Sequence, residues 1–194
     1  MPTEYISAVI LLFVIMDPFG SIPYLMKATQ GFRKPRRAAG ANRATLIAGG
    51  VILVFAIFGA YILSIFSIDA ASFRIAGGLV LAILGLQLVL GISLTHEKKK
   101  DYDTAIIVIG TPMITGPGVI TTIILLEGSM GLVMTLAAAF TALFLTWLTL
   151  RLSVSIQKTV GSQLVEIISR IFGILLVAMA ISFIRAAIFL PVAA

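Results

Sequence analysis

The sequence predicts an all-α membrane protein whose first and fourth helices are each interrupted within the bilayer. Three observations lead to this prediction: most residues are hydrophobic, the charges lie between apolar stretches, and two of these stretches contain a pair of prolines. Hydrophobic residues make up 60% and charged residues 11% of the 194 positions, whereas soluble domains carry about 25% charged residues. We expect six transmembrane helices, arranged as two inverted three-helix repeats with helices 1 and 4 discontinuous.

The apolar stretches define the predicted spans, each close to the ~20 residues that cross a bilayer. They cover about 5–30, 44–66, 74–95, 105–126, 129–151 and 167–189. The first is predicted to break at 17–23 and the fourth at 112–118. Residues 6–16 precede the first break and reach about 16 Å as a helix, which places that break near the middle of the membrane.

The two proline pairs are the most informative motifs in the chain. Residues 17–23 read D-P-F-G-S-I-P, and residues 111–118 read T-P-M-I-T-G-P-G. Because proline removes a backbone donor and clashes with the preceding turn, continuous helix is not expected there. In a bilayer, unwound backbone is tolerated only where it is buried in protein or lines a cavity. Paired interruptions in two halves of a chain indicate the binding site of a transporter.

A second shared motif indicates an internal duplication. Residues 74–83 and 170–179 share Arg, Ile, Gly, Leu and Ala at an offset of 96, and the proline pairs share an offset of 94. We interpret 1–95 as the first repeat, 96–104 as a charged cytoplasmic linker and 105–194 as the second repeat. Three spans per repeat is an odd number, so the second repeat is inverted. Chance similarity between apolar segments is the alternative.

The positive charges predict the orientation in the membrane. In this topology twelve of the 14 Lys and Arg residues lie on one side, and only Arg74 and Arg185 lie on the other. The positive-inside rule then predicts a multi-pass protein of the cytoplasmic membrane with both termini extracytoplasmic. The net charge of +6 sits in loops between apolar spans, so we expect no nucleic-acid partner.

Several enzyme classes lose support from the composition. The chain has no cysteine and a single histidine, His96, which excludes disulfides, thiol catalysis and thiolate metal sites. No His-Asp-Ser set, H-E-x-x-H motif, pair of deep aspartates or Gly-rich nucleotide loop is present. We therefore expect no enzyme activity, no cofactor and no metal site.

Asp17 is the only carboxylate that the predicted spans place deep in the membrane. A charged group at that depth is costly and indicates function by default. The alternative is an aspartate that accepts hydrogen bonds from the amides of the turn ahead of Pro18. The two interpretations are compatible, because a site residue can also hold its own loop.

The predicted substrate-binding residues lie in and beside the two breaks. They are Asp17, Pro18, Gly20, Ser21, Thr111, Thr115, Gly116 and Gly118. Pro23 and Pro117 are expected to open the second halves of the broken helices, with Ser21 and Thr115 near capping positions. The amides at such helix starts attract a carboxylate, and the glycines favour a small solute. The alternative is that the breaks are only hinges or packing kinks.

Other small residues are predicted to have structural roles. Thr121 and Thr122 are expected to bond back to the preceding helical turn. Five glycines are expected to permit close helix packing. These are Gly77, Gly78, Gly85 and Gly91 in the third span and Gly173 in the sixth.

With these motifs the chain resembles the MarC family of membrane proteins, which includes the SnatA-type neutral amino-acid transporters. The resemblance rests on the motifs at 17–23 and 111–118 and on R-I-x-G near the start of the third and sixth spans. It extends over essentially the whole chain. It implies a small neutral amino acid, such as glycine or alanine, as the substrate.

The predicted function is secondary transport of small neutral amino acids across the cytoplasmic membrane, coupled to an ion. Its partners are then the lipid bilayer and the amino acid. Asp17 suits coupling to H⁺, whereas unwound carbonyls suit Na⁺, and the sequence does not choose between them. Two alternatives stay open: an exporter of amino acids or related small solutes, and a non-transporting membrane accessory protein. The oligomeric state is not determined by the sequence.

Overall fold

A computed structural model describes residues 2–28, 34–92 and 114–189 of the chain, and this described part consists of helices joined by short turns. The N-terminal half of the chain forms α1 (Pro2–Met16), α2 (Pro18–Ala28), α3 (Lys34–Ile65) and α4 (Ala70–Leu90). The C-terminal half forms α6 (Pro117–Met130), α7 (Leu132–Arg151), α8 (Ser153–Val160) and α9 (Ser162–Phe189).

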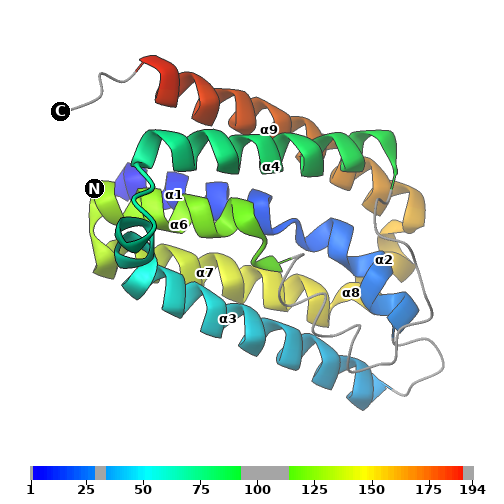
Figure 1. Cartoon of the computed structure of the whole chain (residues 1–194). Coiled ribbons are helices and arrows are strands. Elements are labelled where there is room, and N and C mark those ends of the chain that lie inside the picture. The colour runs from blue at the N-terminus through cyan, green and yellow to red at the C-terminus, as the bar shows by residue number, and fades with distance from the viewer. Residues whose placement is uncertain (1, 29–33, 93–113, 190–194) are drawn as a thin grey trace.

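The long helices lie side by side in one bundle (Figure 1). The start of α1, the α3–α4 and α6–α7 connections and the end of α9 lie at one end, which we call the terminal end. The opposite end, which we call the basic end, holds the start of α3, the end of α7, α8 and the start of α9. It carries Arg43, Arg151, Lys158 and Arg170. The start of α1 and the end of α9 therefore lie at the same end.

Five helices of the described residues are long and apolar enough to cross a membrane. They are Thr3–Ile22, Ala38–Ile65, Ala70–Leu90, Leu132–Arg151 and Ser162–Phe189. The predicted fourth span is represented by α6, a shorter apolar helix of 14 residues, because 105–113 lie outside the described residues. Helices α3 and α9 begin at Lys34 and Ser162, earlier than predicted, and α8 occupies a segment predicted as a connection.

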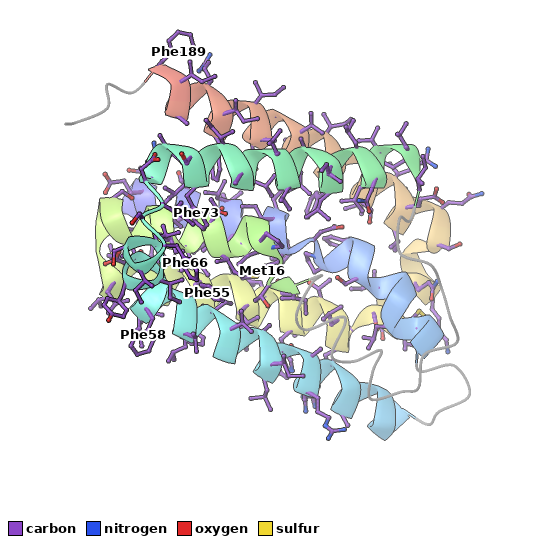
Figure 2. All side chains as sticks on the ribbon, viewed as in Figure 1. Met16, Phe55, Phe58, Phe66, Phe73 and Phe189 are labelled. Atoms are coloured by element: carbon purple, nitrogen blue, oxygen red, sulfur yellow. The ribbon has the colours of Figure 1, made fainter. Side chains whose placement is uncertain are left out.

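Small residues are buried at helix contacts, and many large apolar residues are exposed on the outside of the bundle. On α7, Ala138, Ala139 and Ala142 are completely buried. In contrast, Ile174 is 59% and Phe189 79% exposed, and Figure 2 shows Phe189 pointing away from the bundle. Small residues let membrane helices approach closely, and large apolar side chains suit contact with lipid. This distribution fits a protein whose surroundings are hydrocarbon.

Helices α4 and α9 pack antiparallel through glycines (Figure 1). A Cβ atom at Gly85 would lie 2.6 Å from the Gly173 carbonyl oxygen, and one at Gly173 would lie 2.8 Å from the Gly85 oxygen. A Cβ at Gly78 would lie 3.0 Å from the carbonyl oxygen of Ala180 on α9. The predicted packing role is thus confirmed here.

The prediction of a packing role was wrong for Gly91. This residue follows the last turn of α4 with a φ of 66° and donates its N–H to the carbonyls of Gln87 and Leu88. It is a left-handed C-cap, which glycine adopts without steric cost. Gly77 instead packs against α6, where its missing side chain leaves room for Thr121.

Candidate functional site

The first helix is interrupted at a single residue, Asp17, inside the apolar stretch Thr3–Ile22. Its φ of 36° lies in the left-handed region, which aspartate tolerates better than most residues. The Asp17 N–H donates to the Val14 carbonyl over 3.1 Å and closes α1. The Asp17 Oδ1 accepts the Gly20 N–H over 3.1 Å and caps α2. One residue therefore ends one helix and starts the next.

This interruption is narrower than the predicted break at 17–23. Helix α2 begins at Pro18 and continues through Pro23 to Ala28, so the prediction that Pro23 opens the second half-helix was wrong. The preceding residues explain the choice between the two prolines. Asp17 is among the best N-caps, whereas the Ile22 that precedes Pro23 is among the poorest. In a membrane helix, neighbouring groups can compensate for the hydrogen bond that an internal proline removes.

Gly20 and Ser21 complete this turn. A Cβ atom at Gly20 would overlap the carboxylate of Asp17, so only glycine lets that carboxylate reach the backbone N–H. Ser21 is buried, and its Oγ donates to the Asp17 carbonyl over 3.1 Å. Ser21 was predicted near a helix cap. It instead lies within the first turn of α2, because that helix starts five residues earlier than predicted.

The second motif places a helix start at Pro117. Gly116 is the N-cap of α6 and has an extended backbone, with φ of −64° and ψ of 173°. Pro117 follows it in the first turn of α6, as predicted. Thr115 and Gly116 are both buried. The cap has no side-chain hydrogen bond, because the capping residue is glycine. Thr111 lies outside the described residues.

The hydroxyls that follow in α6 bond within their own helix. Thr121 Oγ1 donates to the Pro117 carbonyl and Thr122 Oγ1 to the Gly118 carbonyl, each over 2.8 Å. The prediction that both residues bond back to the preceding turn is therefore confirmed. These hydroxyls satisfy helix carbonyls near the start of α6.

The end of α1 and the start of α6 meet in the interior of the bundle. A Cβ at Gly118 would lie 3.3 Å from Ile15 Cγ2 and 3.0 Å from Leu81 Cγ, closer still to one Leu81 methyl group. Leu81 comes from α4 and is completely buried. Ile15 precedes Asp17 by two residues and Gly118 follows Gly116 by two. The contact therefore joins the two motifs that the sequence singled out.

A buried hydroxyl from α7 also reaches this region. Thr146 Oγ1 lies 3.6 Å from Met16 Sδ, and both side chains are completely buried. Figure 2 shows Met16 in the interior, beside the start of α6. Thr146 and Leu81 were not predicted from the sequence as neighbours of the breaks. A threonine or leucine in an apolar span has no local pattern that would distinguish it.

The helix ends in the candidate site have opposite polarity. The carboxyl end of α1 carries the negative end of its helix dipole, and Asp17 adds a carboxylate beside it. The amino end of α6 carries the positive end of its helix dipole, although Pro117 has no N–H and the Val119 and Ile120 N–H groups already donate to the Gly116 carbonyl. We use the name candidate site for these two helix ends together with Gly118 and the Ile15 and Leu81 side chains that lie beside it. Such an arrangement matches a small molecule that carries both charges.

These features define an α-helical integral membrane protein with helix ends that meet inside its bundle. The model of the MarC family of integral membrane proteins matches residues 2–190, so the chain belongs to that family.

Relatives of similar length support the assignment. The UPF0056 inner membrane protein YhgN of Escherichia coli is 31% identical over 184 residues, which cover 91% of this chain and 92% of that protein. A UPF0056 membrane protein of Methanocaldococcus jannaschii is 29% identical over 191 residues, 93% of each chain. One from Archaeoglobus fulgidus is 32% identical over 185 residues, with 89% and 86% covered. No solved structure matches this chain.

Proposed function

We propose that this protein is an ion-coupled secondary transporter of small neutral amino acids, such as glycine and alanine, in the cytoplasmic membrane. The observation that carries the proposal is the meeting of the α1 end and the α6 start at Ile15 and Gly118. Unwound helix ends near the middle of a membrane are where many secondary transporters bind substrate. The resemblance to SnatA-type transporters supports the same substrate class.

The proposed binding mode uses the two polarities of the candidate site. The substrate carboxylate lies at the positive end of the α6 dipole, in the position that an N-cap side chain would otherwise occupy. It accepts a hydrogen bond from the Gly118 N–H, because Pro117 has no N–H and the Val119 N–H donates to the Gly116 carbonyl. The ammonium group faces Asp17 and the last carbonyls of α1. Glycine at 116 and 118 lets the two helix ends approach closely. The narrow space between them favours glycine and alanine over larger amino acids.

We further propose that the bundle consists of two inverted repeats, with helices 1 and 4 discontinuous. The antiparallel contact between α4 and α9 supports this, because R-I-x-G occurs in both helices. The start of α6 inside the bundle supports it too, since α2 also begins there (Figure 1). Rocking of one repeat against the other would then expose the site alternately to each side.

The orientation proposal follows from charge. The basic end faces the cytoplasm and the terminal end faces outward, as the positive-inside rule predicts. Thr3 and Lys158 are both exposed and lie at opposite ends, and the chain has no native cysteine. In intact cells an impermeant maleimide should label Thr3→Cys and leave Lys158→Cys unlabelled. The reverse labelling pattern would overturn the orientation.

Uptake by purified protein tests the function. Liposomes that contain the protein should accumulate radiolabelled alanine when an inward Na⁺ gradient or an inward H⁺ gradient is imposed, and protein-free liposomes should not. Unlabelled glycine should compete, whereas phenylalanine should not. If neither gradient drives uptake and preloaded alanine gives no exchange, the result supports the alternative of a non-transporting membrane accessory protein. A thermal-shift series with amino acids, with and without Na⁺, would identify the coupling ion independently.

A further inference from the structure

A cavity of about 350 Å³ opens between α1 and α6 at the terminal end of the bundle. Its walls are formed by the first turns of α1 and the last turns of α6. The lining residues include Glu4, Ser7 and Leu11 on α1, and Leu126, Ser129 and Met130 on α6. The volume falls within the roughly 300–1,000 Å³ typical of small-molecule sites. We call this space the α1–α6 cavity.

Polar and apolar groups occupy different depths of the α1–α6 cavity. Glu4, Ser7 and Ser129 are exposed and lie in the outer turns of their helices. Leu11 and Leu126 are partly buried and lie further into the bundle. The carboxylate at the mouth attracts an ammonium group and disfavours an anionic lipid headgroup.

The helix faces that line the cavity lead to the candidate site. Residues four positions apart lie one above the other on a helix. On α1, Leu11 is followed on the same face by Ile15. On α6, Leu126 is preceded on the same face by Thr122 and then by Gly118. Ile15 and Gly118 are the residues at which the two helices meet.

The inner end of this path is closed by side chains. Leu81 fills the space beside Gly118, and Ile15 lies against the same position. Leu81 and Thr122 are almost completely buried, and Ile15 is only 5% exposed. From Leu11 to Ile15 is about one turn, or roughly 5–6 Å along the helix. The cavity thus ends about one turn short of the contact on α1 and about two turns, or roughly 12 Å, short of it on α6, where Leu126 and Gly118 are eight residues apart.

We infer that the α1–α6 cavity is the entry path by which a zwitterionic small amino acid reaches the candidate site from the terminal end, with Ile15 and Leu81 closing its inner end. This inference rests on the proposed transport function and adds the route and the closing residues. It commits to a zwitterionic solute as the occupant, because the polar mouth leads to a site with two opposite charges.

Cysteine modification with a matched pair of variants tests the route. Ser129 lines the cavity, whereas the adjacent Gly128 is exposed, and a Cβ atom there would meet nothing within 4 Å. Ser129→Cys and Gly128→Cys are modified in detergent with a bulky, positively charged methanethiosulfonate, and mass spectrometry checks completeness. Both are then reconstituted in liposomes, and alanine uptake is compared with that of the unmodified variants. Because the modification is done in detergent, it does not depend on how the protein is later oriented in the liposome membrane.

We expect modified Ser129→Cys to lose at least tenfold in uptake rate and modified Gly128→Cys to keep its rate. Alanine should also slow the modification of Ser129→Cys without affecting Gly128→Cys. Unchanged uptake by fully modified Ser129→Cys, equal loss by both variants, or resistance of Ser129→Cys to the reagent would each overturn the route while leaving transport intact. Absence of uptake by the native chain and both unmodified variants would instead overturn the proposed function, and the route with it.

Discussion

Helices α2 and α6 both begin inside the bundle at a proline, but the residue ahead of that proline differs. Asp17 precedes Pro18 and gives its own carboxylate to the Gly20 amide. Gly116 precedes Pro117 and has no side chain to give. The first helix start is capped from within the chain, whereas the second leaves the capping position to another group. The two motifs look equivalent in sequence, yet only the α6 start suits an incoming carboxylate.

This difference assigns separate roles to the two motifs. Because Asp17 already neutralises the positive end of α2, that helix start is a poor site for an anion. Asp17 as a whole residue is only partly buried, and its carboxylate can also face a cation inside the bundle. The proposed site is therefore asymmetric: α6 holds the substrate carboxylate, and Asp17 with the end of α1 holds its ammonium group. The predictions below change one side of this comparison at a time.

The largest effect is expected from Asp17→Ala, which removes both the cap and the charge. Loss of the cap should cost about 0.5–2 kcal/mol of stability. Loss of a charged hydrogen-bonding partner should cost about 1.5–3 kcal/mol of substrate binding, or roughly 10- to 150-fold in affinity. The unfolding temperature without alanine measures the loss of stability, and the shift of that temperature on adding alanine measures the loss of affinity.

Asp17→Asn is the matched control, because asparagine caps a helix about as well as aspartate. It should keep the unfolding temperature of the native chain and still lose uptake. If Asp17→Asn transports alanine normally with an unchanged pH dependence, Asp17 only braces the turn.

The next effect is expected at Gly118, where α6 meets the end of α1. A methyl group there collides with Leu81, and such overpacking typically costs about 1–3 kcal/mol. Shortening Leu81 should restore the space, so Gly118→Ala and Leu81→Ala in one chain should be less destabilising than the sum of the single changes. Gly128→Ala, which adds a methyl group in open space, is the control and should not destabilise. Additive losses in the double variant would rule out the contact.

A smaller and more selective effect is expected from Gly116→Ser. The backbone of Gly116 is in an extended conformation that other residues adopt, and serine is a better N-cap than glycine by a few tenths of a kcal/mol. The hydroxyl would occupy the position proposed for the substrate carboxylate. We expect KM for alanine to rise severalfold while the unfolding temperature stays the same or rises slightly. An unchanged KM would show that the substrate carboxylate does not bind at the start of α6.

The smallest effect on uptake is expected from Pro23→Ala. Helix α2 runs through this residue, and proline is about 3 kcal/mol less favourable than alanine in a helix interior. The variant should therefore keep its uptake and unfold at the same or a higher temperature. Pro18→Ala, by contrast, should reduce uptake, because without the proline at the start of α2 the helix of α1 can continue through Asp17. Equal losses in both variants would mean that the whole segment 17–23 acts as the break.

The sequence predicted those features that depend on local chemistry. Long apolar stretches predicted the membrane-crossing helices, proline after glycine predicted the start of α6, and threonines near that start predicted bonds to the preceding turn. Proline spacing alone overestimated the first break. The capping preference of Asp17 over Ile22 was already visible in the sequence and would have placed the start of α2 correctly.

Other features depend on contacts between distant segments and had no local signal. Leu81 fills the space beside Gly118, and Thr146 reaches Met16, across separations of 37 and 130 residues. Leucine and threonine are ordinary residues in apolar helices, so nothing in their neighbourhood marks them. The α1–α6 cavity likewise arises from the relative placement of two helices that are far apart in the chain.

The most direct measurement is a structure of the protein with alanine bound, in lipid nanodiscs at saturating alanine. It should show the alanine carboxylate within hydrogen-bonding distance of the Gly118 amide in the first turn of α6, and its ammonium group facing Asp17 or the last carbonyls of α1. Alanine bound away from both helix ends would contradict the account, as would a carboxylate held at the start of α2 instead of α6.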